Sequence, residues 1–413
     1  MIMEIKKKYI SISMKWAVTM LSIIYISGIF TLAEAQQSVF DCGTELTGEP
    51  SALDKNDGKH VTAHGTLRIL VVFAKFPDGS TNNIPSYWDD GYPSFATNSG
   101  ENAFIDGTAD QQSDHFMNLT NYFRQMSMGK LTVLGDVVKV EAPKASTEYD
   151  SRHDANRDIL KKIDVDMGVD FSPYDNWENT GDYMNKNDPD GKVDMIAMIW
   201  RGDPISSNGD QLFSHEGEAS LDSGHNLDVD NNQRVINFSF RSGSGFTVKA
   251  LSSARSLFQD TIHEFAHWLL GGVHPYSDND LTKPDSYDGP IHRVWSMLQN
   301  SFIRANSANT FERDRLGWIN AVEITQNTTG QLGDFYDTGE AYVYHPDNGE
   351  TNEFFYIENH QDISIYDDAT KNSGDKGMFV IHQKGLYGDD DNNRNLSSDG
   401  DYQWKQNKEI QWT

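Results

Sequence analysis

The sequence predicts an α+β fold, in which a first part built of a sheet and helices precedes a β-rich C-terminal part. Short apolar runs are typical of buried strands, other stretches have apolar residues at helical spacing, and short β-like runs alternate with turns after about residue 320. The chain has 413 residues, enough for two domains. Its hydrophobic content of 37% excludes a chain that is disordered throughout.

The first part is expected to begin with a strand, a helix and a hairpin. Leu67 to Phe73 is apolar except at Arg68, which predicts a buried strand. Apolar residues at helical spacing predict a helix over Ser113 to Met128. The residues after it, Lys130 to Val140, predict a β-hairpin that turns at Gly135-Asp136.

The same two patterns continue further along the chain. Asp154 to Ile163 predicts a second helix, and Val193 to Trp200 predicts another apolar strand. Val235 to Phe240 and Phe246 to Lys249 flank a Gly-Ser turn, which predicts an antiparallel pair. The β-rich C-terminal part is predicted from three short runs: Ala341 to Tyr344, Glu353 to Glu358 and Gly377 to His382.

The N-terminus has the pattern of an export signal. A basic start precedes an apolar run from Trp16 to Leu32, and Ala33-Glu34-Ala35 places small residues where a signal peptidase cuts. The sequence therefore predicts a secreted, extracellular protein, with an uncleaved membrane anchor as the alternative. The expected boundaries are a signal peptide at 1–35, a linker or short pro-segment at 36–65, a first domain of sheet and helices at 66–320 and a β-rich domain at 321–413.

The charge of the chain limits its partners. The formal net charge is −28, and removing residues 1–35, which carry four Lys and two Glu, changes it by a further −2 to −30. This acidity argues against nucleic acid and anionic membranes as partners. It is consistent with a soluble extracellular protein, which we expect to be a monomer and which could hold Ca²⁺.

A zinc-binding motif lies on the last predicted helix of the first part. This helix is expected from about Ser252 to Leu270, and Gly271-Gly272 provides a stop signal after it. It contains His263 and His267, which lie one above the other on one helix face because they are four residues apart. Both imidazoles can therefore bind one zinc ion.

Glu264 lies beside the two histidines and is the expected general base. Zinc lowers the pKa of a bound water toward about 7. Glu264 could take a proton from this water and pass it to the leaving amine of a cleaved peptide. The sequence therefore predicts a zinc metalloendopeptidase, whose substrates would be proteins or peptides.

The third zinc ligand is predicted from the residues that follow the helix. His274 is the first choice, because Gly271-Gly272 would let the chain turn back toward the metal. In metzincins a Gly and a His follow the second ligand by three and six residues, whereas here they follow by four and seven. Asp278 and Asp280 therefore stay open as alternatives. In metzincins a Met in a tight turn lies beneath the zinc-binding histidines, and Met297 fits this Met by its order and distance in the sequence. The alternative is that Met297 is an ordinary core residue.

The single cysteine cannot form an internal disulfide bond. Cys42 lies close to the expected mature N-terminus. Its thiolate could occupy the zinc of a latent enzyme, or it could be an inert N-terminal thiol.

Several segments, in their order along the chain, resemble the immune-inhibitor-A family of secreted bacterial metallopeptidases. The similarity covers about residues 66–385. The segments are Leu67 to Asp78, Asn121 to Val133, Asp188 to Met195, His263 to His267, Arg315 to Ile319, Phe354 to Gln361 and Gly377 to Gln383.

The resemblance implies a zincin-like catalytic domain, a zinc ion, often structural calcium, and broad cleavage of extracellular proteins. The family commonly has Gly three residues and Asp six residues after the second His. This sequence has Leu270 and Val273 there, a departure that leaves the third ligand open.

A calcium site is predicted in the segment that resembles the family's aspartate-rich loop. Asp188, Asp190 and Asp194 surround a Pro and a Gly, and carboxylates at such spacing can wrap Ca²⁺. The alternative is a merely acidic turn. Two other functions also stay open: a calcium-binding surface adhesion or glycan-binding protein with an inactive HExxH, and an exported zinc hydrolase that acts on another bond.

Overall fold

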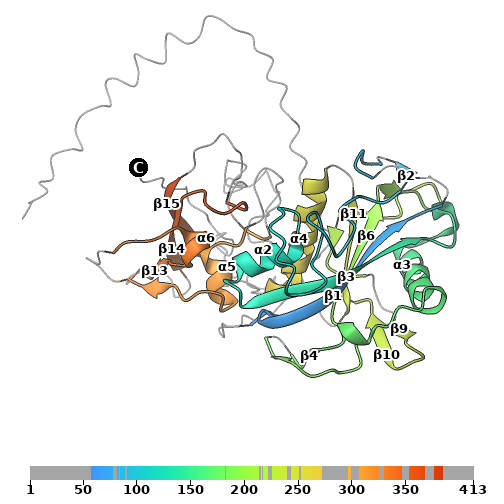
Figure 1. Cartoon of the computed structure of the whole chain (residues 1–413), viewed down its shortest axis with the longest axis horizontal. Helices are drawn as coiled ribbons and strands as arrows, with labels where there is room; N and C mark the ends of the chain where they lie inside the picture. Colours follow the sequence, from blue (N-terminus) through green and yellow to red (C-terminus); the bar gives the residue numbers. More distant parts are fainter. Residues whose placement is uncertain are drawn as a thin grey trace, which may run out of the picture. The chain divides into compact units, whose positions relative to one another are not determined.

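The computed structural model shows a mixed structure of sheets and helices, compatible with the predicted α+β class (Figure 1). The described residues all fall within one compact unit. The structure describes residues 57–77, 81–82, 84–88, 91–181, 183–213, 215, 217–221, 226–239, 243–250, 253–271, 296–298, 307–324, 330–346, 353–367 and 376–384. The predicted signal peptide at 1–35 and Cys42 lie outside this part. Among the described residues, no helix is both long and apolar enough to cross a membrane.

A five-stranded sheet forms the centre of the first part. Its strand order is β3-β1-β6-β11-β8. β1 pairs in parallel with β3 and β6, β11 pairs in parallel with β6, and the short strand β8 is antiparallel to β11. The strands are β1 (Gly65–Lys75), β3 (Leu131–Glu141), β6 (Ile196–Arg201), β8 (Gly217–Glu218) and β11 (Gly245–Ala250).

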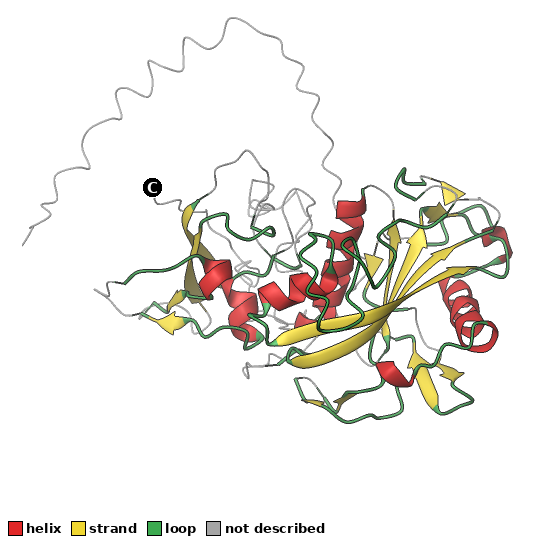
Figure 2. Cartoon of the chain, viewed as in Figure 1, coloured by secondary structure: helices red, strands yellow, loops and turns green. Residues whose placement is uncertain are grey.

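Helices cover both faces of this sheet (Figure 2). Alternate residues of β1 divide between two hydrophobic clusters: Ile69 and Val71 belong to the cluster of α2 and α4, and Leu70 and Val72 to the cluster of α3. This is why Ile69 to Ala74 of β1 are apolar without interruption and do not alternate with polar residues. The helices are α2 (Leu119–Met126), α3 (Arg152–Lys161) and α4 (Ala254–Leu270).

The predicted hairpin at Lys130 to Val140 is wrong, because β3 is one continuous strand that pairs with β1 along its whole length. Gly135 lies inside this strand. A Cβ atom there would lie 2.5 Å from the Ile69 carbonyl oxygen and 2.7 Å from Ile105 Cδ1, so the glycine permits close packing. Asp136 forms an ion pair of 2.6 Å with Arg68. The Gly-Asp pair therefore serves packing and charge pairing, not a turn.

The predicted antiparallel pair around the Gly-Ser turn is also wrong. β10 (Arg234–Asn237) pairs antiparallel with the preceding strand β9 (Asn226–Val229), whereas β11 joins the central sheet. All six residues of β11 are buried. A two-stranded hairpin could not cover both faces of such a strand, and a place inside the sheet does.

The remaining elements of the first part are short. Helix α2 is shorter than predicted, and its N-cap Asn118 accepts a hydrogen bond from the backbone N–H of Asn121. Helix α3 begins two residues earlier than predicted, after the N-cap Ser151. The short elements are β2 (Thr81–Asn82), β4 (Glu178–Asn179), β5 (Asn185–Lys186), β7 (Asp203–Pro204), the 3-10 turns Ser146–Glu148 and Ser172–Tyr174, and a π-helical turn at Lys162–Asp166.

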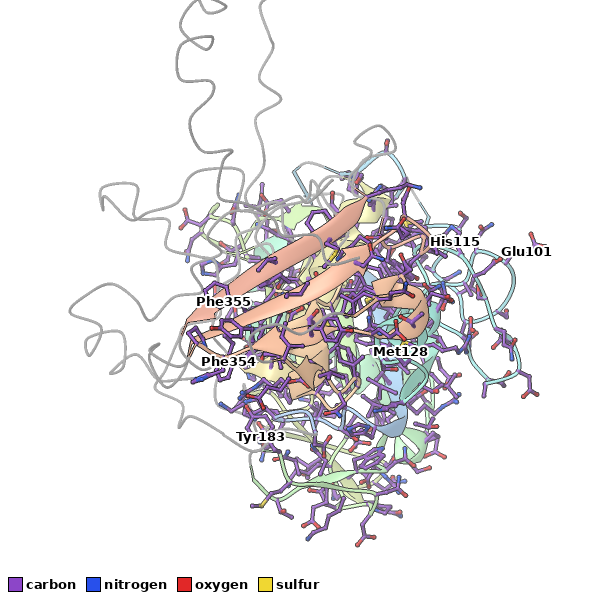
Figure 3. The ribbon with its side chains drawn as sticks, turned by 90° about the vertical axis from the view of Figure 1, so that its left-hand side faces the viewer. Glu101, His115, Met128, Tyr183, Phe354 and Phe355 are labelled. Carbon is purple, nitrogen blue, oxygen red and sulfur yellow. The ribbon has the colours of Figure 1, made fainter. Side chains whose placement is uncertain are left out.

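A four-stranded sheet in the order β12-β13-β14-β15 follows, and its strands β13, β14 and β15 lie at the three predicted β-like runs, whereas β12 was not predicted. Its residues Tyr356, Phe379 and Ile381 belong to the same hydrophobic cluster as the residues of α4. In Figure 3, which is turned by 90° from Figure 1, this sheet faces the viewer, and Phe354 and Phe355 of β14 are labelled. The elements are α5 (Thr310–Arg315), β12 (Val322–Glu323), α6 (Phe335–Thr338), β13 (Tyr342–Tyr344), β14 (Glu353–His360) and β15 (Gly377–Lys384).

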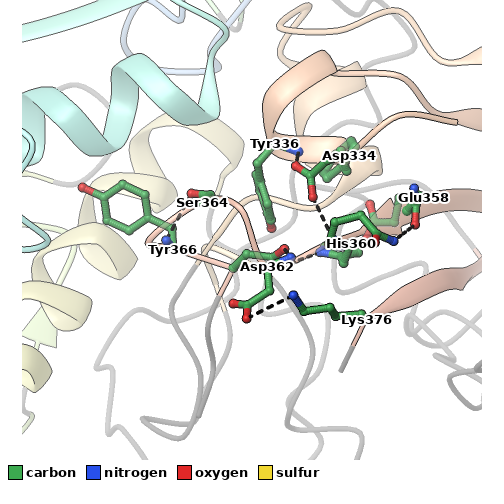
Figure 4. A network of polar contacts seen from close by, with 12 residues as sticks. Asp334, Tyr336, Glu358, His360, Asp362, Ser364, Tyr366 and Lys376 are labelled. Carbon is green, nitrogen blue, oxygen red and sulfur yellow. Dashed lines mark hydrogen bonds and ion pairs between the residues drawn. The ribbon is translucent and has the colours of Figure 1, made fainter. Parts of the chain in front are cut away.

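A buried polar network joins this sheet to α5 (Figure 4). The two ring nitrogens of His360 lie 2.6 Å from Asp367 Oδ1 and 3.0 Å from Glu358 Oε1. The other oxygen of Glu358 accepts hydrogen bonds from the backbone N–H and the hydroxyl of Thr310, at the start of α5. Burial lowers the pKa of His360, but the two carboxylates outweigh it and raise that pKa to about 9. The imidazolium therefore lies between two carboxylates.

Candidate metal centre

The helix that carries the HExxH motif has clear local start and stop signals. The Ser253 hydroxyl accepts a hydrogen bond from the backbone N–H of Ser256, and the helix then runs from Ala254 to Leu270, close to the predicted range. Gly271 ends it with a positive φ of 101°, a conformation that favours glycine. Every residue from Ser256 to Leu270 is buried, because the helix packs against β11 and β8 of the central sheet.

His263, Glu264 and His267 come together on this helix. Each offers one ligand atom, these atoms lie within 4.8 Å of one another, and all three residues are buried. The two imidazole rings are 4.9 Å apart, centre to centre, and inclined by 78°. Within the part of the chain that the structure describes, no other group of three His, Cys, Asp or Glu residues is close enough to share an ion.

A second contact fixes the orientation of His267. Its Nδ1 lies 2.9 Å from the carbonyl oxygen of Gly271. A carbonyl can only accept, so Nδ1 carries the proton and the lone pair is on Nε2. Burial lowers the pKa of His267 to about 4, although the Gly271 carbonyl opposes this shift. The imidazole is therefore neutral at pH 7, as a metal ligand must be.

No protein-family model and no curated protein matches this chain. The function is therefore inferred from the geometry of the site and the sequence pattern. The residues predicted as third zinc ligand, His274, Asp278 and Asp280, lie outside the described residues. The structure thus describes two of the three expected ligands and the expected base.

Sequence reasoning missed the role of Glu312 beside Met297. Met297 is buried, and its backbone N–H donates to Glu312 at 3.1 Å, while the Ser296 hydroxyl donates to the other carboxylate oxygen at 2.6 Å. Burial raises the pKa of Glu312 to about 7, although these hydrogen bonds oppose the shift. Glu312 also closes a capping box with Asn309 at the start of α5. The Asn-x-x-Glu spacing was the available sequence signal.

Two of the three carboxylates of the predicted calcium site have separate partners, and the third is exposed. Asp194 accepts hydrogen bonds from the backbone N–H groups of Asn176 and Trp177, at 2.8 Å and 3.2 Å. Asp190 pairs with Lys192 at 2.7 Å, and Asp188 is exposed. The three residues form no group with ligand atoms close enough for one ion. Burial of Asp194 raises its pKa to about 8. The geometry gives the calcium prediction no support.

Gly271 offers a direct test of the contact that orients His267. Its φ of 101° strains any residue with a Cβ, and such a Cβ would lie 3.2 Å from the side chain of Lys59. Gly271→Ala is therefore expected to displace the carbonyl, weaken zinc binding about 10- to 100-fold and destabilise the fold by about 1–3 kcal/mol.

The matched control for Gly271→Ala is Gly168→Ala. Gly168 also has a positive φ, 65°, but open space around its Cβ position, and it follows the helical turn on the other face of the sheet. Zinc affinity and thermal unfolding are measured for both variants. An unchanged zinc affinity in Gly271→Ala would show that the Gly271 carbonyl does not orient a zinc ligand.

Proposed function

We propose that this protein is a secreted zinc metalloendopeptidase that cleaves extracellular proteins. The observation that carries the proposal is the buried trio His263, Glu264 and His267 on one helix, with the His267 ring oriented by the Gly271 carbonyl. The predicted export signal and the order of the family-like segments support secretion and a zincin-like catalytic domain.

The residues present fit zinc better than calcium or magnesium. Two imidazole nitrogens on adjacent helical turns form the described donor set, and zinc prefers such nitrogens whereas the hard cations prefer oxygen. When bound, zinc would activate a water molecule and polarise the scissile carbonyl. His274, Asp278 or Asp280 would supply the remaining protein ligand.

Glu264 performs the proton transfers in this proposal. It follows His263 directly and is fully buried, so its carboxylate lies beside the ligands in a site from which bulk water is largely excluded. It takes a proton from the attacking water and later gives it to the leaving amine of the peptide. The two histidines hold the metal, and the Gly271 carbonyl keeps one of them correctly oriented.

Metal analysis and an activity assay of the purified protein test the proposal together. We expect about one zinc ion per chain and clearing of casein or gelatin in a zymogram. A zinc chelator should abolish the clearing, and added zinc should restore it. Calcium without zinc, together with no cleavage, would instead favour a calcium-binding adhesion protein.

A further inference from the structure

A short segment near the N-terminus closes the end of the metal-binding helix. We call residues Asp57 to His64 the N-terminal clamp. The backbone N–H of Lys59 donates to the carbonyl of Leu269 at 2.8 Å, and that of His60 donates to the carbonyl of Trp268 at 2.9 Å. The last carbonyls of a helix have no partner within the helix itself. The clamp therefore completes the turn that directly follows His267.

The clamp is a built structure and not a loose linker. The Asp57 carboxylate accepts hydrogen bonds from the backbone N–H groups of Gly58 and Ala63, at 2.7 Å and 2.8 Å, which closes the segment into a loop. The Asn185 side chain donates to Asp57 and to the Gly58 carbonyl, at 3.0 Å and 2.7 Å. The Trp318 indole donates to the Ala63 carbonyl at 2.8 Å. Partners distant in sequence thus hold the clamp in place.

The clamp also contacts Gly271, whose carbonyl orients His267. The side chain of Lys59 is completely buried, and its Cδ and Nζ would lie 3.2 Å and 3.5 Å from a Cβ on Gly271. A lysine cation at the C-terminus of a helix also complements the partial negative charge there. The backbone of Lys59 therefore caps the end of the helix, and its side chain contacts Gly271, whose carbonyl orients His267.

We propose that the N-terminal clamp positions His267 for zinc binding, and that any maturation cut in the predicted linker or pro-segment falls before Asp57. The proposal rests on the proposed zinc site. A cut within the clamp would free the carbonyls of Trp268 and Leu269 and release Lys59 from Gly271. The expected result of such a cut is a folded protein with a weakened metal site.

Gly58→Ala in the otherwise unchanged chain tests the clamp. A Cβ on Gly58 would lie 2.1 Å from the Val61 carbonyl oxygen and 3.0 Å from the Leu269 side chain, so the loop must shift. The control is Gly91→Ala, because nothing lies within 4 Å of a Cβ at Gly91. We expect a zinc affinity about 10- to 100-fold lower in Gly58→Ala than in the control. The spectrum of the cobalt-substituted protein should change as well, since it reports ligand geometry.

Different outcomes separate the clamp from the zinc site. Equal zinc affinity and equal cobalt spectra in the two variants would overturn the clamp, even if Gly58→Ala unfolds at a lower temperature. If Gly58→Ala does not fold, Asn185→Ala should lower zinc affinity several-fold, and no change would overturn the clamp.

If the wild-type protein binds no zinc, the proposed function fails. The clamp is then judged by exchange of the Gly271 amide hydrogen, expected to be at least tenfold faster in Gly58→Ala than in Gly91→Ala.

The N-terminus of the active, secreted protein tests the second part of the proposal. Sequencing or mass spectrometry of the purified enzyme is expected to find it at or before Asp57. An active enzyme whose chain begins at His60 or later would overturn the proposal. Such a chain lacks Lys59, whose N–H caps the Leu269 carbonyl, and Asp57, whose carboxylate closes the clamp.

Discussion

Glu264→Gln is expected to abolish peptide cleavage while zinc binding is retained. The amide has the size of the carboxylate but cannot accept a proton, so the attacking water loses its base. General acid–base catalysis contributes about 10²- to 10⁴-fold, and kcat should fall by that factor. His263 and His267 remain, and zinc content should therefore stay at the wild-type level.

The control for Glu264→Gln is Glu101→Gln, at an exposed loop residue labelled in Figure 3. Both variants lose one negative charge, so a general effect of charge would appear in both. The measurements are kcat and KM on a peptide substrate, and zinc content after dialysis. Wild-type cleavage by Glu264→Gln would rule out the proposed base.

The second large effect is expected from the buried His360 network. His360→Gln removes the cation between Glu358 and Asp367, which stay buried as carboxylates. Breaking a buried ion pair by removing one partner costs about 3–5 kcal/mol, because a buried charge then lacks its partner. Thermal or denaturant unfolding should show a loss of this size. Lys144→Gln is the control, since its pair with Asp158 is half exposed and worth at most about 1 kcal/mol.

The same network predicts how stability depends on pH. The pKa of His360 is about 9 in the folded protein and near its ordinary value of 6.5 when unfolded. The folded state thus holds this proton more tightly. Its stabilising contribution is complete below pH 6.5 and is lost as the pH rises through 9. Burial also raises the pKa values of Glu312 and Asp194. These two groups therefore lower the free energy of unfolding as the pH rises, and they do so equally in wild type and variant. The difference in unfolding free energy between wild type and His360→Gln should therefore shrink from pH 6.5 to pH 9. A constant difference would contradict the role of the imidazolium.

Local signals predicted the candidate metal helix well. The helix boundaries follow from Ser253 and Gly271, and the approach of the two histidines follows from their spacing of four residues. Both signals act within a few residues of the chain, so the surrounding fold does not alter them. The apolar run of β1 was equally informative, because a strand buried on both faces needs apolar residues at every position.

Where the prediction failed, distant partners decide the structure. Gly135-Asp136 has the composition of a turn, but Ile105 and Arg68 make it the centre of a strand. The role of Glu312 depends on Met297, fifteen residues away, and on burial that no local pattern shows. Side chains that serve contacts across the fold have no fixed spacing in the sequence, so periodicity cannot find them.

The hydrogen bond from the Trp318 indole to the Ala63 carbonyl joins residues 255 positions apart. During synthesis, the clamp is made early, but its partner follows only after the whole central sheet and α4 have left the ribosome. Closing so long a loop is slow, because the chain loses conformational entropy before the long-range contact stabilises it. The clamp at the end of the candidate metal helix can therefore be completed only after the chain has been made as far as Trp318. A chain that is still being made would therefore carry the HExxH helix before the clamp at its end is complete.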